Sequence, residues 1–295
     1  MAETLESVLG QQLPPNEIII VDDGSTDNTA EVIAAFGSAV QSVTVANGGP
    51  GAARKRAIKG CNNRWIALCD SDDVWCSSHL RRKHEAIVSF PEVNIITSNF
   101  ESFGPAAVPG QTRLGSAPVG WLQRYTNVQR EGFHKIEDPY RATLDFNSLY
   151  LSGLVINKEL YHAAGGIDLA YRDWQAEDSE FTRRMVAQAS ACLVIDTDIT
   201  WGYRRHENNF SATQWKNIYA KARIIQEHID AGVVASEVLN YAQDEVYRTR
   251  GEAFDIAFWT GFYADACGIY SELPRTEKTL KRRVRRVLSY LRNFG

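Results

Sequence analysis

Two apolar segments in the first quarter of the chain each end in a group of aspartates, and this pattern constrains the fold more than any other feature. Residues 17–21 run directly into Asp22 and Asp23, and residues 65–68 are followed by the segment Asp70–Asp73. A continuous apolar run of this length is typical of a strand that is covered on both faces. Because ionised carboxylates resist leaving water, both acidic groups are expected at the surface, where their strands end.

The segments around these strands alternate in type. Helical spacing is found at residues 29–36 and 52–60, and a short strand is predicted at 42–46. This order predicts an α/β fold with a mostly parallel, Rossmann-like sheet flanked by helices. Ligands of such sheets bind outside the carboxyl ends of the strands, so both acidic loops should share one rim. Further elements are predicted as strands at 93–98, 151–156 and 193–203, helices at 1–10 and 158–164, a first domain at 1–214 and a helical region at 215–295.

The charge distribution limits the kinds of partner. The chain has 295 residues, with 32 Lys and Arg against 36 Asp and Glu, and its net charge is −4. Residues 275–295 alone carry +7, which leaves −11 on the rest, and this balance argues against nucleic acid as the main partner. The five cysteines lack CxxC spacing, which favours a reduced, cytosolic compartment. The apolar stretch 253–270 is interrupted by Asp255 and Asp265, so it is predicted to be a buried helix rather than a membrane span.

The second acidic group has two interpretations on its own chemistry. Close carboxylate oxygens suit a hard divalent cation such as Mg²⁺ or Mn²⁺, which could also hold a substrate diphosphate. A solvated Asp/Ser turn after a strand would give the same local sequence. The shared rim predicted for the two acidic loops favours the metal site.

Four motifs stand in an order and spacing that resemble a known family. The chain resembles the inverting, nucleotide-sugar-dependent family 2 glycosyltransferases, which have the GT-A fold, over roughly residues 1–210. The motifs are Val21-Asp22-Asp23-Gly24-Ser25-Thr26-Asp27, Asn47-Gly48-Gly49-Pro50-Gly51-Ala52-Ala53-Arg54, Asp70-Ser71-Asp72-Asp73-Val74-Trp75 and Glu177-Asp178.

The resemblance implies a role for each residue that binds the donor. Asp23 is expected to accept from the N–H of a pyrimidine base. The alternative is a helix-capping turn, a role that Asp22 and Asp27 fill more naturally. Arg54, in the glycine-rich donor loop, is expected to favour a phosphate or the base, and a simple surface charge would look the same. Asp70 and Asp72 match the DxD motif. This implies that Asp72 binds Mn²⁺ or Mg²⁺ directly and that Asp70 contacts the ribose or metal-bound water.

The resemblance also implies the residue that removes the acceptor proton. Asp178 matches the catalytic base, and Glu177 is expected to orient it or the acceptor. Without the other motifs, an ordinary acid in the first turn of a helix would be the preferred interpretation of Asp178. The late segment that contains Arg205 and His206, followed by Ser211, resembles a basic stretch that closes over the diphosphate, with His206 as a metal or phosphate contact.

Two aromatic residues and the N-terminus raise separate expectations. Trp174 and Trp201 could stack on sugar faces, although buried core is the commoner use of tryptophan. Members of the family usually begin with one more strand, which lies in the middle of the sheet and carries part of the base pocket. This chain lacks it, which suggests a late start, a truncated product or another segment in its place. Two central strands would then lose a partner, with lower stability or weaker donor binding.

The C-terminal tail has the pattern of a basic amphipathic helix. Apolar residues recur at helical spacing within residues 275–295. Such a helix can lie on an anionic membrane surface, or it can pack its apolar stripe on the acidic body of the protein.

Together these features predict a metal-dependent transferase. The expected reaction moves a hexose or N-acetylhexosamine from a nucleotide sugar, most simply UDP-linked, to a hydroxyl of a glycan, lipid-linked or cell-surface acceptor. The expected location is cytoplasmic, with the tail as a candidate for peripheral contact with the inner face of a membrane. The alternatives are a degenerate relative that binds a nucleotide or glycan without turnover, and a nucleotidyltransferase, which would not explain Glu177 and Asp178.

Overall fold

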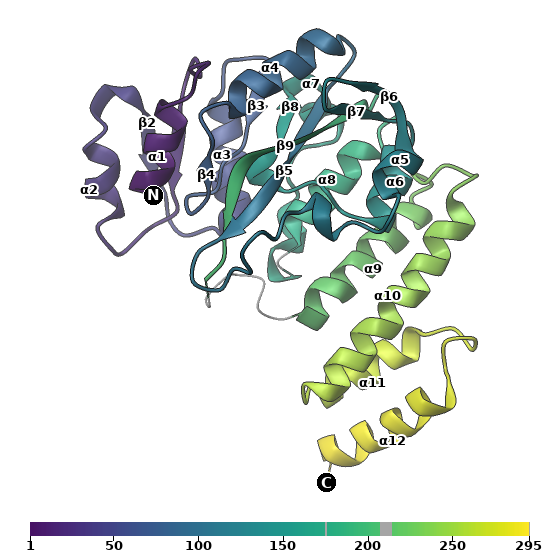
Figure 1. Cartoon of the computed structure of the whole chain (residues 1–295). Coiled ribbons are helices and arrows are strands. Elements are labelled where there is room, and N and C mark those ends of the chain that lie inside the picture. The colour runs from purple at the N-terminus through teal and green to yellow at the C-terminus, as the bar shows by residue number, and fades with distance from the viewer. Residues whose placement is uncertain (175, 207–213, 295) are drawn as a thin grey trace. The chain divides into compact units, whose positions relative to one another are not determined.

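The computed structural model describes residues 1–174, 176–206 and 214–294, and the chain forms two compact units (Figure 1). The first unit comprises Met1–Arg172 and Phe181–Asn209, and the second comprises Asp173–Glu180 and Phe210–Gly295. The boundary expected after residue 214 remains a prediction. The contacts also group the short segment 173–180 with the C-terminal helices, which no sequence pattern indicated.

The first unit is an α/β structure. Its strands are β1 (Ile19–Asp22), β2 (Gln41–Thr44), β3 (Trp65–Ala67), β4 (Val74–Trp75), β5 (Ile95–Phe103), β6 (Thr126–Arg130), β7 (Phe133–Ile136), β8 (Val155–Asn157) and β9 (Leu193–Arg204). Its α-helices are α1 (Ala2–Leu9), α2 (Thr29–Ala34), α3 (Pro50–Gly60), α4 (His79–Ser89), α5 (Trp121–Tyr125), α6 (Pro139–Asp145) and α7 (Lys158–Ala163), and α8 (Glu177–Val186) begins in the second unit. Short 3-10 helices lie at η1 (Gly37–Ala39), η2 (Leu114–Ser116), η3 (Leu151–Gly153) and η4 (Leu169–Trp174).

The main sheet has seven strands and is mixed rather than mostly parallel. Its order is β3-β8-β5-β9-β7-β6, and β4 pairs with β9. Among the described strands of this sheet, β5 and β9 run parallel, and the other pairs are antiparallel. One cause is local, because β6 and β7 are joined by a two-residue turn in which Glu131 and Gly132 both have positive φ, at 48° and 85°. Such a turn favours an antiparallel hairpin.

The first two strands form a parallel ladder of their own. β1 pairs with β2, and within the described residues no ladder joins β1 to β3. The carbonyls of Ile18 and Asp22 accept hydrogen bonds from backbone N–H groups on the β2 side. The N–H and C=O groups of Ile19 and Val21 therefore point to the opposite edge of β1. Both edge residues are half-buried, whereas the sequence predicted a strand covered on both faces. The sequence predicts that central strands lose a partner. In the described part of the chain, no strand pairs with the second edge of β1.

A small hydrophobic cluster supports this ladder. Leu5 of α1, Ile20 of β1, Ile33 of α2 and Val40 pack together, separately from the larger core under α4. That larger core includes Phe90, Ile96, Phe133 and Val194.

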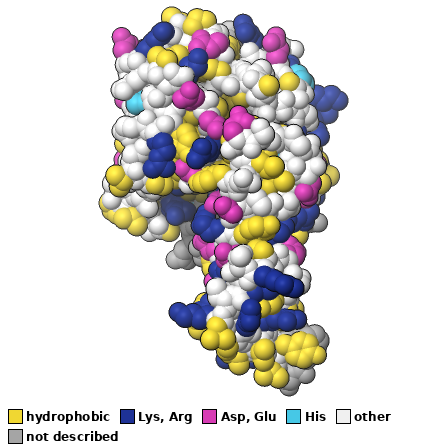
Figure 2. All heavy atoms as spheres, turned by 90° about the vertical axis from the view of Figure 1, so that its right-hand side faces the viewer, with side chains coloured by type: hydrophobic (Ala, Val, Ile, Leu, Met, Phe, Trp, Pro, Cys, Tyr) yellow, Lys and Arg dark blue, Asp and Glu magenta, His cyan; other side chains and the backbone are white. Residues whose placement is uncertain are grey.

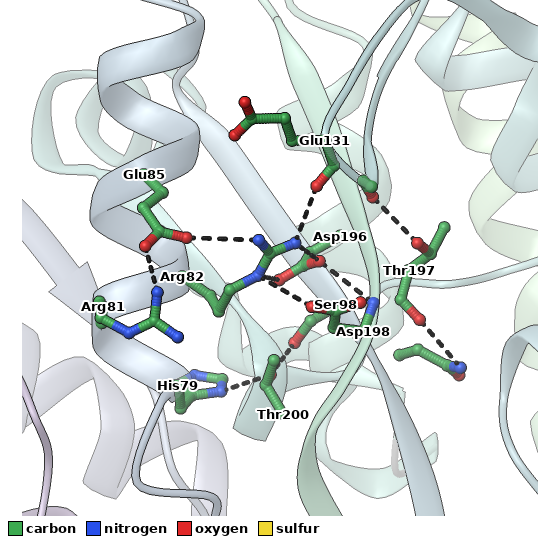
Figure 3. A network of polar contacts seen from close by, with 12 residues as sticks. His79, Arg81, Arg82, Glu85, Ser98, Glu131, Asp196, Thr197, Asp198 and Thr200 are labelled. Atoms are coloured by element: carbon green, nitrogen blue, oxygen red, sulfur yellow. Dashed lines mark hydrogen bonds and ion pairs between the residues drawn. The ribbon is translucent and has the colours of Figure 1, made fainter.

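A buried polar network fixes α4 on the main sheet (Figure 3). Arg82 donates to both oxygens of Asp196, at 3.1 and 2.6 Å, and Asp196 is fully buried. The His79 ring nitrogen Nδ1 lies 2.8 Å from the Thr200 hydroxyl, which lies 2.7 Å from the hydroxyl of Ser98. Because directional contacts of this kind set register, the network positions β9, whose C-terminal end reaches the candidate site.

The second unit is helical, as the sequence predicted from residue 215 onward. Its helices are α9 (Gln214–Asp230), α10 (Leu239–Trp259), α11 (Tyr263–Glu272) and α12 (Leu280–Phe294). The single buried helix expected at 253–270 is wrong, because the chain turns at Gly261, which has φ +87°. α10 and α11 then pack through Phe254, Phe258 and Tyr270. Among the described helices, none is both long and apolar enough to span a bilayer.

Candidate active site

The first acidic loop and the glycine-rich loop are held together by one carboxylate. Asp23 accepts hydrogen bonds from the backbone N–H groups of Gly48 and Gly49, both at 2.7 Å. Each carboxylate oxygen has a further lone pair, so Asp23 can also accept an N–H from a base. The structure thus brings two predicted motifs together, and the base-binding role of Asp23 remains a prediction.

The neighbouring aspartates hold the turn itself. Asp22 is buried and accepts from the Ser25 backbone N–H at 2.9 Å and from the Thr44 hydroxyl at 3.3 Å. Hydrogen bonds from Ser25, the side chain first, lower the pKa of the Asp22 carboxyl group. Asp27 accepts from the backbone N–H of Thr29 at 3.0 Å. These two residues therefore have the turn-capping role that the sequence offered as an alternative for the motif.

The glycine-rich loop passes close to an arginine from far along the chain. Gly49 has φ +87°, and a Cβ atom at this position would lie 3.0 Å from Nε of Arg172. A side chain here would therefore meet both an unfavourable backbone conformation and a steric contact. No sequence motif indicates Arg172, whose only signal is a basic residue a few positions before Glu177.

The arginine of the donor loop pairs with the first aspartate of the DxD motif. Arg54 donates from Nε and Nη2 to one oxygen of Asp70, at 3.0 and 2.6 Å. The backbone N–H of Asp70 donates to the Ser152 hydroxyl at 3.0 Å. Both charged side chains are partly exposed, so the pair can exchange partners with a ligand. Ser152 is a further residue at the site that the sequence analysis missed.

The second aspartate of the motif lies beside the late histidine. His206 Nε2 is 3.3 Å from a carboxylate oxygen of Asp72, and both side chains are more than one-third exposed. The Arg204 side chain donates from Nε to the backbone carbonyl of Asp72 at 2.7 Å. The C-terminal end of β9 is therefore attached directly to the DxD loop, although 132 residues separate Arg204 from Asp72 in the sequence.

The third aspartate is structural. Asp73 is 2% exposed and accepts from the backbone N–H of Arg204 at 2.9 Å. Burial raises the pKa of its carboxyl group to about 7, while hydrogen bonds from Ser152 and Arg204 act in the opposite direction. Through this bond to β9, Asp73 orients the loop that carries Asp70 and Asp72.

The donor atoms present fit a divalent cation that is completed by substrate. Among the residues that the structure describes, no three His, Cys, Asp or Glu side chains are grouped to hold a metal ion. Asp72 and His206 nevertheless offer one carboxylate oxygen and one imidazole nitrogen side by side. Mg²⁺ and related ions are commonly bound by one or two protein ligands together with substrate phosphates. The metal roles of Asp70, Asp72 and His206 remain predictions.

Arg205 is exposed at the end of the same strand. Its backbone N–H donates to the Phe103 carbonyl at 2.7 Å, and its guanidinium lies 5.7 Å from the ring centre of Tyr203. The side chain is therefore available to a ligand, in keeping with its predicted role. Ser211, the last residue of the predicted basic segment, lies outside the described residues.

The predicted catalytic pair begins α8 and belongs to the second unit. Asp178 is exposed, whereas Glu177 is only 4% exposed. One oxygen of Asp178 accepts from the backbone N–H of Ser179 at 2.6 Å. Both acids lie in the first helical turn. Their catalytic roles stay predictions.

The two tryptophans differ in accessibility. Trp201 is 1% exposed and packs on Phe100 at 4.4 Å, so the sugar-stacking role offered for it is wrong. Trp174 is half-buried in the second unit. Its ring lies 5.5 Å from the ring of Tyr219, and the Arg223 guanidinium lies 4.9 Å from its ring centre.

The comparison with known families decides which of these expectations are established. A family model described as "Glycosyl transferase family 2" matches residues 1–141, which contain the first three motifs. Residues 1–141 are a family 2 glycosyltransferase domain.

Named relatives of this glycosyltransferase domain share its N-terminal part. The putative teichuronic acid biosynthesis glycosyltransferase TuaG of Bacillus subtilis is 36% identical over 87 residues, which cover 28% of this chain and 34% of TuaG. The Escherichia coli protein named "UDP-Glc:alpha-D-GlcNAc-diphosphoundecaprenol beta-1,3-glucosyltransferase WfaP" is 29% identical over 159 residues, covering 48% of this chain and 61% of WfaP. The chain spans between 14% and 34% of the length of TuaG and two other similar relatives.

Solved structures establish the fold of the chain. TarS of S. aureus superposes with a TM-score of 0.64 and 16% identity, over 98% of this chain and 84% of that one, and TarS has also been solved with UDP-GlcNAc. A mannosyltransferase from Pyrobaculum calidifontis, solved with GDP-Man and Mn²⁺, gives a TM-score of 0.55 and 15% identity, over 99% of this chain and 82% of that one. The GT-A fold predicted from the sequence is thereby confirmed.

Proposed function

We propose that the chain is a metal-dependent, inverting glycosyltransferase. It moves a hexose or an N-acetylhexosamine from a UDP-sugar to a hydroxyl of a glycan or lipid-linked acceptor, in the synthesis of a cell-envelope polysaccharide. The observation that carries the proposal is the pairing at one rim of the first unit: Arg54 with Asp70, and Asp72 with His206. The names of TuaG and WfaP, and the complex of TarS with UDP-GlcNAc, support the choice of donor and acceptor classes.

The residues of the rim have complementary tasks in holding the donor. Asp23 fixes the glycine-rich loop and accepts from the base. Arg54 exchanges part of its contact with Asp70 for a donor phosphate, because a partly exposed ion pair costs little to rearrange. Arg205 adds positive charge beside the diphosphate. Asp72 and His206 would hold Mn²⁺ or Mg²⁺, which supplies counter-charge for the departing diphosphate.

The transfer itself is an in-line displacement. The acceptor oxygen forms a bond to the anomeric carbon while the bond from that carbon to the diphosphate oxygen breaks. The bonding electron pair leaves with the diphosphate, and the acceptor proton passes to the Asp178 carboxylate. Because attack comes from the face opposite the leaving group, the anomeric configuration inverts. Glu177 orients the base or the acceptor.

The test is sugar transfer by the full chain from UDP-hexoses and UDP-N-acetylhexosamines, with Mn²⁺ or with a chelator. Transfer is expected only with the metal. Asp178→Asn should lower the rate by about 100-fold or more, because general-base catalysis typically contributes that much. Asp168→Asn, an exposed acid of the first unit, is the matched control and should leave the rate unchanged. Equal rates for wild type and Asp178→Asn would remove Asp178 from the mechanism.

The main alternative is a degenerate relative that binds without turnover, and the separate ladder of β1 and β2 favours it. If calorimetry showed that UDP binds, and no sugar were transferred from any of the donors tested, that alternative would be established. The proposal places the reaction in the cytoplasm, with residues 275–295 in peripheral contact with the inner face of a membrane, where lipid-linked acceptors would be within reach.

A further inference from the structure

The C-terminal helix turns its apolar side away from the other helices of its unit. α12 has an apolar stripe at helical spacing, and every member is exposed, with exposed fractions of 77% for Leu280, 59% for Val287 and 60% for Leu291. On the opposite side of the helix, the small polar residue Ser289 is fully buried. The usual arrangement of a surface helix places its apolar stripe on the core, so α12 is inverted. Within the second unit the stripe therefore does not pack on the neighbouring helices, and the sequence alternative in which it packs on the acidic body of the protein remains a prediction.

Ionic contacts explain why the helix sits this way round. Arg282 donates to Asp255 of α10 at 3.2 and 3.0 Å and also contacts Glu277. Arg285 reaches the other oxygen of Asp255 at 2.5 Å. Near the C-terminal end, Arg292 donates to the Tyr263 hydroxyl of α11 at 2.7 Å. These contacts attach the basic side of α12 to its own unit and leave the apolar stripe outside.

The borders of the stripe are positively charged. Lys281 and Arg283, one on each side of it, are exposed, and so is Arg286. Residues 275–295 carry a net charge of +7. Figure 2 shows hydrophobic and basic side chains close together at the height at which Figure 1 draws α12. An exposed apolar stripe with cations along both edges matches an anionic bilayer, whose headgroups meet the cations while acyl chains receive the stripe.

We propose that α12 is a preformed docking surface for an anionic phospholipid membrane, held in its outward-facing orientation by the contacts of Arg282 and Arg285 with Asp255. The helix has 15 residues, about 22 Å at the usual rise per residue, and it carries several charges. It therefore lies in the plane of the interface rather than across the bilayer. The inference deepens the peripheral membrane contact of the proposed function by naming the surface and the class of lipid, and it rests on the proposed transfer reaction only in its purpose, which is to bring a lipid-linked acceptor to the enzyme.

The test is flotation of the full chain with vesicles of phosphatidylcholine alone or mixed with phosphatidylglycerol. Binding is expected only to the anionic vesicles, and it should weaken as salt is raised. The triple variant Val284→Ser, Val287→Ser, Leu291→Ser should bind at least ~10-fold more weakly, because each buried methylene contributes about 0.8 kcal/mol. The matched control is Val88→Ser with Val119→Ser, which removes two exposed valines from the first unit and should bind like wild type.

A second pair of variants tests the orientation. Lys281→Gln with Arg283→Gln should reduce binding to anionic vesicles without changing helix content, which circular dichroism measures. Asp255→Asn should also reduce binding, although it removes a negative charge, because α12 loses its attachment. Tighter binding by Asp255→Asn would show that charge alone drives association and would overturn the docking geometry.

Two further outcomes would also overturn the proposal. One is equal flotation by wild type and the stripe variant. The other is a concentration-dependent dimer, seen by light scattering, that the stripe variant abolishes while vesicle binding is absent, because a second copy would then cover the stripe. Hydrolysis of UDP-sugar in solution is measured in parallel and is expected to be unchanged in the stripe variant. A failure of membrane docking is thus distinguishable from a failure of the enzymatic proposal.

Discussion

At the scale of single residues, the site is built from carboxylates that each have a different partner. Asp23 binds backbone N–H groups, Asp70 binds an arginine and Asp72 lies beside a histidine. Asp73 is buried and bonds to the backbone. The four aspartates thus have different roles because they occupy different positions: two support loops, one forms an ion pair and one is a candidate metal ligand. Each role predicts a different response to substitution.

Asp23→Asn tests whether this residue supports the loop or also reads the base. The amide nitrogen of asparagine would face a backbone N–H, so we expect a loss of about 1–2 kcal/mol in the free energy of unfolding, measured by urea titration. If Asp23 also binds the base, the preference for UDP over GDP in calorimetry should fall. The control is Asp27→Asn, at an exposed position of the same loop, which should leave the nucleotide preference unchanged. An unchanged nucleotide preference would confine Asp23 to the scaffold.

Arg54→Gln should separate ligand binding from stability. The pair with Asp70 is partly exposed, so its loss should change the free energy of unfolding by less than about 1 kcal/mol. The affinity for UDP should nevertheless fall by about tenfold, because a charge-assisted contact to phosphate is lost. The control is Arg56→Gln. Arg56 lies on the same helix with an exposed side chain, so this substitution should leave the affinity for UDP unchanged. Equal affinities for both variants would contradict the phosphate role.

The sequence predicted most of these residues because their chemistry is carried by short motifs at strand ends. It could not predict Arg172 or Ser152, which reach the site only through tertiary folding. Trp201 was ambiguous for a related reason, since burial depends on the neighbours that β5 supplies. Local spacing identifies residues that share a loop, whereas contacts between distant segments need the fold.

At the scale of elements, strands and helices with strong periodicity match their predicted ranges closely. α3, α7 and β9 differ from prediction by only a few residues at each end. The direction of strand pairing was less predictable, because the early βαβ pattern does not extend to the later hairpin of β6 and β7. The break between α10 and α11 depends on one glycine conformation, which apolar content cannot reveal.

Helix α4 contains a group that should make stability depend on pH. Lys83 is fully buried, and its amino group has no hydrogen-bond partner among the described residues. Burial lowers its pKa from 10.5 to about 7, with Arg82 acting in the same direction and Asp196 opposing it. Between these values the unfolded chain holds a proton that the folded chain has released. The contribution of Lys83 to stability therefore rises from pH 7 to pH 10.5.

Lys83→Met should remove that dependence. At pH 7 we expect the variant to gain roughly 2–4 kcal/mol in the free energy of unfolding, because an unpaired buried amine is replaced by an apolar chain of similar length. The gain should shrink as pH approaches 10, measured by urea unfolding at several pH values. Lys59→Met, exposed on α3, should show no such change. Parallel pH profiles for Lys83→Met and wild type would contradict the assignment.

At the scale of the whole molecule, the chain passes between its two units more than once. The segment 173–180 carries Asp178 and groups with α9 to α12, although it is flanked on both sides by parts of the first unit. Within the second unit, Trp174 packs on Tyr219, whose hydroxyl donates to Glu272 at 2.5 Å. The candidate base is therefore supported by helices that carry none of the donor motifs.

Tyr219→Ala should lower transfer while leaving the donor bound. The substitution removes the ring under Trp174, so we expect kcat to fall by about tenfold and the Kd for UDP to stay constant. Tyr219→Phe keeps the ring and loses only the hydroxyl, and it should restore most of the rate. If both variants lose activity equally, or if UDP binding weakens, the supporting role of Tyr219 is wrong.

The separate ladder of β1 and β2 has a consequence for how the protein opens. It has its own small cluster around Leu5 and Ile20, and one of its edges lacks a strand partner among the described residues. Such a region can melt locally while the seven-stranded sheet stays native. A bound nucleotide would then act as a folding ligand for the N-terminal end, and part of its affinity would be used to order that end.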